Sequence, residues 1–228
     1  MKVVIILVIL EVKGLNKYYL QGQNKHHILK DITMNVNEGD FLGIIGPSGS
    51  GKTTLLYCLS SLETIDSGEI TLDSQNINNL SDDLVSELRQ NHLGFIFQFY
   101  NLVPNLTAYE NVLLANVIAG RNDENKINEL LDLVGMSEYR DYYPNELSGG
   151  MQQRIAIARA LVNNPRILFA DEPTGNLDQK KGKEIMDLLE KLNKDSNLTI
   201  VLVTHNEDYL KYCNRTINLI DGEFIDNK

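Results

Sequence analysis

One eight-residue segment limits the folds open to this chain more than any other. Residues 46–53 read Gly-Pro-Ser-Gly-Ser-Gly-Lys-Thr, a glycine-rich loop that ends in Lys52 and Thr53. The apolar run Phe41–Ile45 precedes it, and leucines at helical spacing follow it at positions 55, 56, 59 and 62. A strand, a glycine-rich loop and a helix in that order are typical of a phosphate-binding P-loop. The segment therefore predicts an α/β fold in which this loop joins a buried strand to a helix.

The composition of the loop suits a polyphosphate. Glycines allow the tight turn that points successive backbone N–H groups at phosphate oxygens, and the helix start adds about half a positive charge. Lys52 is expected to bridge the β- and γ-phosphates, and the Thr53 hydroxyl is expected to ligate Mg²⁺. We expect a bound nucleotide to contact the loop and the residue after it, which are Gly46, Pro47, Ser48, Gly49, Ser50, Gly51, Lys52, Thr53 and Thr54.

A second feature is an acidic pair at the end of an apolar run. Ile167–Ala170 predicts a strand buried on both faces, and Asp171 and Glu172 follow it. In a parallel sheet the carboxyl end of such a strand is the edge where ligands bind, so we expect these acids beside the phosphate loop. Asp171 is then placed to hold Mg²⁺, directly or through water, and Glu172 to polarise an attacking water. An isolated Asp-Glu pair is often only a solvated turn, but this chain also contains a P-loop.

The rest of the chain alternates short apolar strands with amphipathic helices, which predicts a largely parallel sheet. Further strands are expected at Glu69–Leu72, Gly94–Phe97 and Leu198–Val203. Strand signals disappear between residues 101 and 163, where helical periodicity takes over. We therefore expect a single domain over residues 1–228, with a core at about 1–98 and 164–228 and an inserted helical lobe at about 99–163.

The composition excludes some classes of protein. The formal net charge of −10 argues against binding nucleic acid over a broad surface, because such binding needs a basic stripe. Cys58 and Cys213 lie in apolar stretches without metal-ligand spacing, so we interpret them as buried thiols in a reducing compartment.

The amino-terminal run Val3–Leu10 is apolar but shorter than the roughly 20 residues that a membrane-spanning helix needs. Its β-branched residues favour an edge strand, with a membrane-touching segment as the alternative. No other stretch is apolar for long enough to cross a bilayer, so we do not expect this chain to form a transport path by itself.

The segment Leu147-Ser148-Gly149-Gly150-Met151-Gln152-Gln153-Arg154 gives the chain its family resemblance. From about Leu10 to about Gly222 the chain resembles the ATP-binding subunit of ATP-binding cassette (ABC) transporters. The resemblance implies a Mg²⁺-dependent ATPase with a P-loop core, an antiparallel amino-terminal β subdomain and an inserted helical lobe. It also implies a head-to-tail homodimer, in which Ser148, Gly149 and Gly150 of one subunit contact ATP bound to the other. An ordinary capped helix start would account for Ser148, but it would leave the paired glycines unexplained.

The resemblance also assigns roles to residues outside these motifs. Tyr19 matches the aromatic residue that stacks on adenine, with Tyr18 as the fallback if the register slips by one. Gln98 matches the glutamine that touches Mg²⁺ and the attacking water. Asp178 matches a loop that crosses the dimer interface, and His205 matches the histidine that contacts the γ-phosphate and orients Glu172. The remaining histidines, His26, His27 and His92, are interpreted as surface or loop residues.

The sequences of the motifs around Gln98 and Glu172 are similar to those of ABC subunits for lipoprotein release, macrolide export and antimicrobial-peptide export. The resemblance implies a separate transmembrane permease as partner and a cytoplasmic location on the inner face of the membrane. The expected permease dock follows Gln98, and about half of it is expected to be lobe core: Phe99, Tyr100, Leu102, Val103 and Leu106. An importer subunit, a soluble ABC ATPase acting on ribosomes or DNA, and a P-loop kinase remain the alternatives. The transported substrate cannot be inferred from this sequence.

Overall fold

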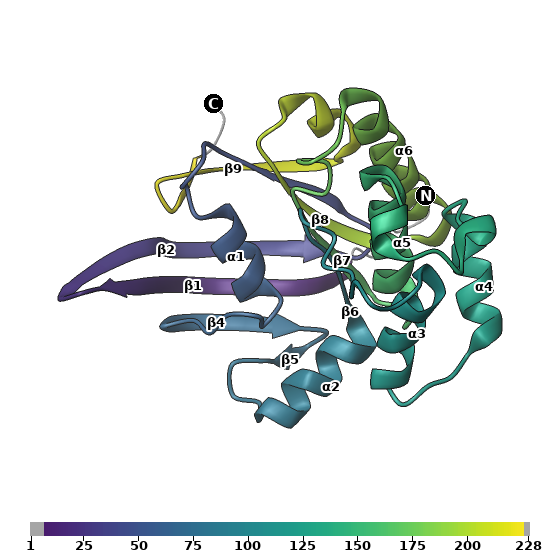
Figure 1. Cartoon of the computed structure of the whole chain (residues 1–228). Helices are drawn as coiled ribbons and strands as arrows, with labels where there is room; N and C mark the ends of the chain where they lie inside the picture. Colours follow the sequence, from purple (N-terminus) through teal and green to yellow (C-terminus); the bar gives the residue numbers. More distant parts are fainter. Residues whose placement is uncertain (1–6, 226–228) are drawn as a thin grey trace, which may run out of the picture. The chain divides into compact units, whose positions relative to one another are not determined.

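The computed structural model describes residues 7–225 and contains two compact units. The first unit combines the described residues up to Val85 with those from Thr199 onward, and the second unit runs from Ser86 to Leu198. Both contain strands and helices (Figure 1). The predicted boundaries of the helical lobe at about 99 and 163 stay a prediction, since the two units divide the chain elsewhere.

The first unit contains an antiparallel sheet with the strand order β2-β1-β4-β5. Its strands are β1 (Val8–Gln21), β2 (Asn24–Asn37), β4 (Ser67–Leu72) and β5 (Gln75–Asn76). This sheet confirms the predicted antiparallel subdomain. The prediction of an edge strand at Val3–Leu10 is wrong where it can be checked, because β1 pairs with β2 on one side and β4 on the other. Residues 3–6 lie outside the described part of the chain.

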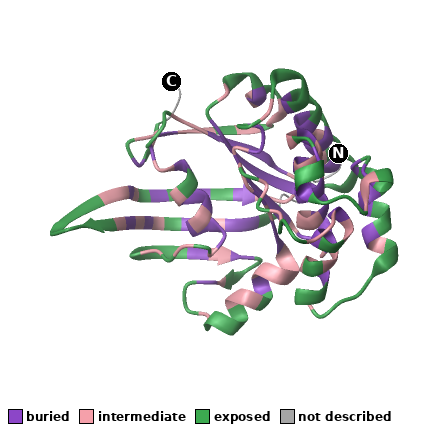
Figure 2. Ribbon diagram, in the orientation of Figure 1, coloured by how far each residue is buried: buried purple, intermediate pink, exposed green. Residues whose placement is uncertain are grey.

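The first unit also contains the strands that carry the P-loop, in the order β10-β9-β3-β8. They are β3 (Phe41–Ile45), β8 (Thr199–Thr204), β9 (Arg215–Ile220) and β10 (Glu223–Ile225). Strand β3 is parallel to both β8 and β9, and α1 (Lys52–Leu59) follows the loop. Every residue of β8 is buried, as its unbroken apolar sequence predicts (Figure 2).

The second unit pairs two parallel strands, β6 (Leu93–Ile96) and β7 (Ile167–Asp171). The ring of Phe95 stacks on Phe169 and Phe97, with centroids 5.8 Å and 6.0 Å apart. Helix α2 (Asp82–His92) leads into β6, and the other helices are α3 (Ala108–Ile118), α4 (Glu124–Leu133), α5 (Gly149–Leu161) and α6 (Gln179–Ser196). Residues 101–163, all of them described, form helices and turns but no strand, which confirms the predicted helical stretch.

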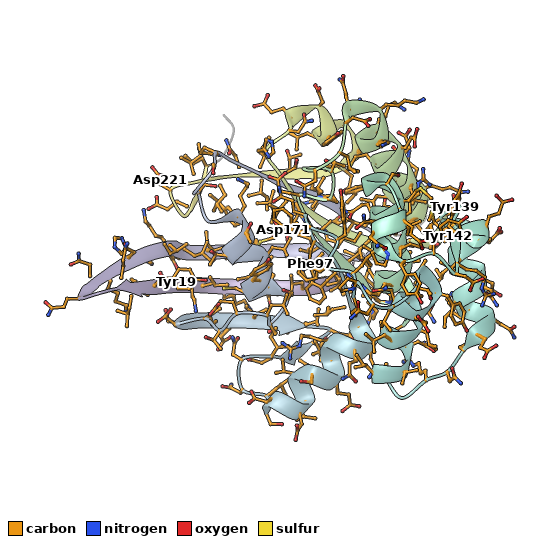
Figure 3. All side chains as sticks on the ribbon, viewed as in Figure 1. Tyr19, Phe97, Tyr139, Tyr142, Asp171 and Asp221 are labelled. Atoms are coloured by element: carbon orange, nitrogen blue, oxygen red, sulfur yellow. The ribbon has the colours of Figure 1, made fainter. Side chains whose placement is uncertain are left out.

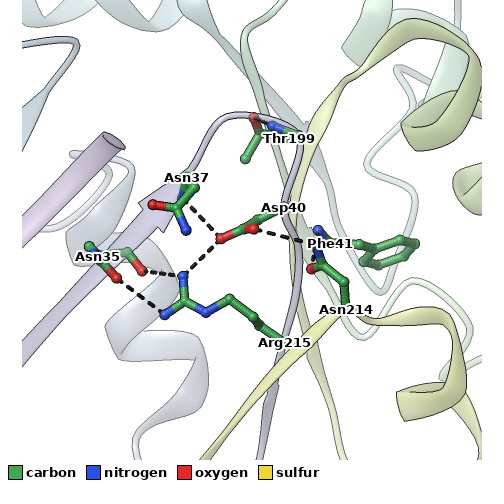
Figure 4. Close-up of polar contacts among 8 residues, drawn as sticks. Asn35, Asn37, Asp40, Phe41, Thr199, Asn214 and Arg215 are labelled. Carbon is green, nitrogen blue, oxygen red and sulfur yellow. Dashed lines mark hydrogen bonds and ion pairs between the residues drawn. The ribbon is translucent and has the colours of Figure 1, made fainter. Parts of the chain in front are cut away.

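A buried carboxylate joins three strands of the first unit (Figure 4). Asp40 is 6% exposed and accepts hydrogen bonds from the Arg215 guanidinium at 2.8 Å and from the Asn37 N–H at 3.0 Å. The same guanidinium donates to the backbone carbonyl of Asn35, and Asn214 accepts from the N–H of Phe41. A buried charge is stable only with such partners, so the network fixes the ends of β2, β3 and β9 to one another.

Within residues 7–225, no helix combines the length and the apolar character needed to span a membrane.

Candidate functional site

The P-loop has the backbone that its glycines predict. Gly49 and Gly51 lie in the left-handed region at φ values of 81° and 101°, and α1 begins at Lys52 without a side-chain cap. A Cβ on Gly46 would lie 2.0 Å from the carbonyl oxygen of Leu219, so only glycine fits there. The tight loop therefore depends on missing side chains at three positions.

Two polar groups of this loop fit a phosphate ligand. Lys52 is only 8% exposed, and its ammonium donates to the carbonyls of Gly46 and Pro47, at 2.8 and 2.9 Å, which engages two of its three protons. The Ser50 side chain is 2% exposed, and its Oγ has no hydrogen-bond partner among the described residues. A buried ammonium and an unsatisfied hydroxyl in a glycine-rich cradle form a donor set that suits a polyanion.

A turn near the carboxyl terminus supports the loop from outside. The N–H of Gly222 donates to the carbonyl of Ser50 at 3.1 Å, and the Gly222 carbonyl accepts from the N–H of Lys30 at 2.9 Å. Asp221 and Gly222 both have positive φ, at 49° and 79°. The Asp-Gly pair is a sequence signal for a turn, but nothing in the sequence indicates that this turn supports the P-loop.

The structure separates the two tyrosines that the sequence left open. The Tyr18 ring stacks on His27 at 4.1 Å, and the Lys25 ammonium lies 3.9 Å from the Tyr18 centroid. Tyr19 lies on β1, is 40% exposed and has the Lys17 ammonium 5.3 Å from its centroid (Figure 3). Tyr18 is therefore occupied by two neighbours, and Tyr19 is the better candidate for stacking on a base.

The predicted acidic pair ends strand β7 in the second unit. Asp171 is the last residue of the strand and is 7% exposed. Glu172 follows with φ at 46°, a left-handed conformation that is unusual for a residue other than glycine. Its carbonyl accepts from the N–H of Gly175 at 3.0 Å, which closes a turn. Strained backbone of this kind occurs preferentially at functional sites.

The segment after β6 contacts the turn after β7. The carbonyl of Gln98 accepts from the Asn176 amide at 2.8 Å, and a Cβ on Gly175 would lie 2.9 Å from Gln98 Nε2. Asp178 caps α6 by accepting from the N–H of Lys181 at 2.9 Å, and this hydrogen bond lowers the pKa of the Asp178 carboxyl. Asp178 therefore has a local capping role, and its predicted place at a dimer interface stays a prediction.

The start of α5 has an unusual cap. Ser148 occupies the N-cap position and is exposed, but its hydroxyl makes no capping hydrogen bond within the described chain. The helix is anchored further along, where the fully buried Gln153 donates to the carbonyl of Pro173 at 2.7 Å. A serine at an N-cap normally accepts from the first turn, so this start leaves its donors available to an external anion.

The candidate dock is only partly exposed. Phe99 is 71% and Val103 is 38% exposed, whereas Tyr100, Leu102 and Leu106 are partly buried. Three of the five are thus partly buried and none is fully buried, and the expectation that about half belong to the core of the lobe stays a prediction.

The predicted site residues are distributed over both units. The P-loop, Tyr19 and His205, which directly follows β8, belong to the first unit. Gln98, the serine and glycines at the start of α5, Asp171, Glu172 and Asp178 belong to the second. The predicted nearness of Asp171 to the P-loop stays a prediction. Among the described residues, no group of three or more His, Cys, Asp or Glu side chains is placed to hold a metal ion.

Comparison with known protein families and structures gives consistent results. A family model described as "ABC transporter" matches residues 29–175. The chain is 44% identical over 222 residues to the macrolide export ATP-binding/permease protein MacB of Mannheimia succiniciproducens, covering 96% of this chain and 34% of that protein. It is 42% identical to the lipoprotein-releasing system ATP-binding protein LolD of Geobacter metallireducens, covering 95% of this chain and 98% of that protein. The chain thus spans about a third of the length of the MacB relative.

Among solved structures, one of the similar chains is the ATP-binding cassette MJ0796 in a dimeric post-hydrolysis state bound to ADP and Pi. That chain has a TM-score of 0.88 and 41% sequence identity, and the match covers 95% of this chain and 97% of that one. The corresponding protein of Methanocaldococcus jannaschii is 43% identical over 221 residues, which is 94% of either chain.

Proposed function

Because this chain belongs to the ABC transporter family, as an ATP-binding cassette ATPase, we propose that it powers a separate membrane permease through ATP-dependent dimerisation. The permease is of the exporter or mechanotransmission type. The observation that carries the proposal is the start of α5, where the exposed Ser148 leaves its hydroxyl out of the helix cap. A donor site of this kind suits the phosphate of a nucleotide bound to a second subunit.

The P-loop is the proposed nucleotide site of each subunit. Lys52 exchanges its loop carbonyls for phosphate oxygens, and the Ser50 hydroxyl gains the partner that it lacks within the described chain. Tyr19 stacks its exposed ring on adenine. Replacing Lys52 with alanine is expected to weaken nucleotide binding, since the loop loses its only buried ammonium.

Thr53, Gln98 and Asp171 are the proposed Mg²⁺ ligands. Magnesium usually takes one or two protein carboxylates together with waters and phosphate oxygens, so a closed cage of protein ligands is unnecessary. When bound, the ion neutralises charge on the phosphates.

Glu172 is the proposed general base and His205 its orienting partner. We assign the metal to Asp171, which ends the strand, and the attacking water to Glu172, which follows it in a left-handed backbone conformation. The protein takes little part in covalent chemistry, so catalysis depends on positioning the reacting groups and stabilising their charge.

The names of the relatives support the transport role. LolD is the ATP-binding protein of a lipoprotein-releasing system, and MacB is a macrolide export ATP-binding/permease protein. By analogy this chain binds a permease at the inner face of a membrane, and Phe99 is the most exposed residue of the expected dock.

The test is the solution mass of Glu172→Gln, measured by light scattering with and without Mg-ATP. The expected result is a shift from monomer to dimer only with ATP, together with turnover reduced by on the order of a hundredfold. Lys52→Ala in the same background is the matched control and should stay monomeric. Near-normal hydrolysis by Glu172→Gln, or a monomer at every ATP concentration, would contradict the proposal.

A further inference from the structure

The backbone conformation of Gly149, the first residue of α5, does not require a glycine. Its φ is not positive, so the helix would accept other residues there. A Cβ on Gly149 would, however, lie 2.6 Å from the hydroxyl oxygen of Tyr100, a distance that real Cβ atoms do not tolerate. The side-chain space of Gly149 is therefore filled by the Tyr100 hydroxyl.

Tyr100 is itself held in place by the other end of the same helix. Tyr100 and Asn101 both have left-handed backbones, at φ values of 61° and 50°. The Arg159 guanidinium, near the end of α5, donates to the carbonyls of both residues, at 2.7 Å in the case of Tyr100. Two non-glycine residues in this conformation are strained, and the fork of one arginine holds the strained turn together.

The turn that contains Tyr100 begins at Gln98. Gln98 contacts Gly175 and Asn176 in the turn after β7. Phe99, between Gln98 and Tyr100 in the chain, is 71% exposed. Three consecutive residues therefore provide a proposed Mg²⁺ ligand (Gln98), an exposed apolar side chain (Phe99) and a hydroxyl that fills space at the start of α5 (Tyr100).

We propose that Tyr100 is a positioning residue for the start of α5: its hydroxyl against Gly149 sets where Ser148 and the first N–H groups of the helix lie, and Arg159 fixes Tyr100. This inference rests on the proposed function, because the position of this helix start matters only if it meets a nucleotide on a second subunit. A force applied at Phe99 would then reach Ser148 through one side chain.

A double-mutant cycle in the Glu172→Gln background tests the contact. Gly149→Ala alone should raise the ATP concentration for half-maximal dimerisation by about tenfold or more, because its methyl group meets the Tyr100 hydroxyl. Adding Tyr100→Phe removes that oxygen and leaves Leu177 Cδ2 at 3.4 Å and the ring carbon Cζ at 3.5 Å, which are ordinary contacts. Most of the lost dimerisation should therefore return in the double variant.

Tyr142→Phe is the matched control for loss of a hydroxyl in the same unit. Tyr142 packs edge-on against Tyr139, with ring centroids 5.4 Å apart (Figure 3), and this change should neither weaken dimerisation nor rescue Gly149→Ala. Thermal unfolding of every variant shows whether it is folded. If Gly149→Ala does not fold, Arg159→Lys replaces it, and a dimer weakened several-fold is expected in a variant that still unfolds cooperatively, since a lysine ammonium lacks the planar fork that Arg159 presents to the two carbonyls.

The outcomes separate the inference from the function on which it rests. If Gly149→Ala weakens dimerisation equally with Tyr or Phe at position 100, the role of Tyr100 is overturned, even when the parent dimerises with ATP. An Arg159→Lys variant that dimerises as tightly as the parent overturns this role as well. A parent that stays monomeric with Mg-ATP overturns the proposed function itself.

Discussion

The Lys17 ammonium lies 5.3 Å from the ring centroid of Tyr19 and forms an ion pair with Glu63 at 2.6 Å. The same ammonium donates to the carbonyl of Thr64 at 2.6 Å, and Lys17 is 5% exposed. The buried Lys17 ammonium is held by Glu63 beside the Tyr19 ring and orients this ring. The exposed part of the Tyr19 ring is proposed to contact adenine. Lys17 and Glu63 thus support Tyr19, the residue proposed to bind the base.

Replacing Lys17 with methionine should lower the free energy of unfolding by about 1–3 kcal/mol, because Glu63 and the Thr64 carbonyl lose their donor. Affinity for adenine nucleotides should fall by up to about fivefold as Tyr19 loses its neighbour. Urea denaturation and titration with a fluorescent ATP analogue measure the two effects. Lys13→Met is the control, since Lys13 pairs with Glu11 at the surface and should change stability by less than about 1 kcal/mol. Equal effects from the two changes would argue against the clamp.

The ion pair also predicts a pH dependence. Burial would lower the pKa of Lys17, but the hydrogen bond to Glu63 and its charge outweigh burial and raise the pKa above the ordinary value of 10.5. A raised folded-state pKa gives stability that is fully present below the unfolded value and lost as pH rises through the folded value. The advantage of wild type over Lys17→Met should therefore stay constant between about pH 7 and 9 and shrink only above about 10.5. An advantage that shrinks already between pH 7 and 9 would mean that burial dominates.

Gly222→Ala should damage the P-loop from a distance. A Cβ there would lie 2.2 Å from the carbonyl oxygen of Ile28, and the residue has φ at 79°, so the turn that donates to Ser50 must move. We expect a loss of about 2 kcal/mol or more in stability and weaker nucleotide binding. Gly120→Ala has a similar φ of 71° with no atom within 4 Å of the added carbon, so it controls for backbone strain alone. It should cost about 1 kcal/mol and leave the nucleotide affinity unchanged.

Both cysteines should be slow to react in the folded protein. Burial raises the pKa of Cys58 and of Cys213 to about 12, and the thiolate is the reactive form of a thiol. A colorimetric thiol reagent at about pH 8 should therefore modify neither group quickly until denaturant is added, and both quickly afterwards. Rapid reaction of either one in the native protein would show that its pKa is lower.

Sequence patterns predicted the segments in which one local signal decides the structure. The run Phe41–Ile45 became β3, and Ile167–Ala170 became most of β7, because continuous apolar residues have a low free energy only when both faces of the strand are covered. The P-loop followed from its glycines, two of which do adopt positive φ. Cys58 is buried, as its apolar neighbours in the sequence indicated, whereas Cys213 is only partly buried.

Long-range pairing was not predictable in the same way. Strand β1 extends to Gln21, and its register with β2 shifts between Leu15 and Lys17 and again between Lys17 and Tyr18. These irregularities reset the alternation of the two faces, which is why the sequence kept Tyr18 as a fallback beside its preferred Tyr19. His26 and His27 are in β2 rather than in a loop, although His26 is exposed as expected. The contact of Tyr100 with Gly149 depends on two turns separated by a helical segment, and no periodicity indicates it.

The partners Asp40 and Arg215 are 175 positions apart in the chain, and this separation has a consequence for synthesis on the ribosome. The second unit is continuous in sequence, whereas the first needs β8 and β9 from near the carboxyl terminus to pair with β3. Chains grow from the amino terminus at about 5–20 residues per second, so the P-loop is made seconds before its supports at Leu219 and Gly222 exist. A product released before Arg215 would carry the phosphate-binding motif without a completed loop, and Asp40 would lack its cation.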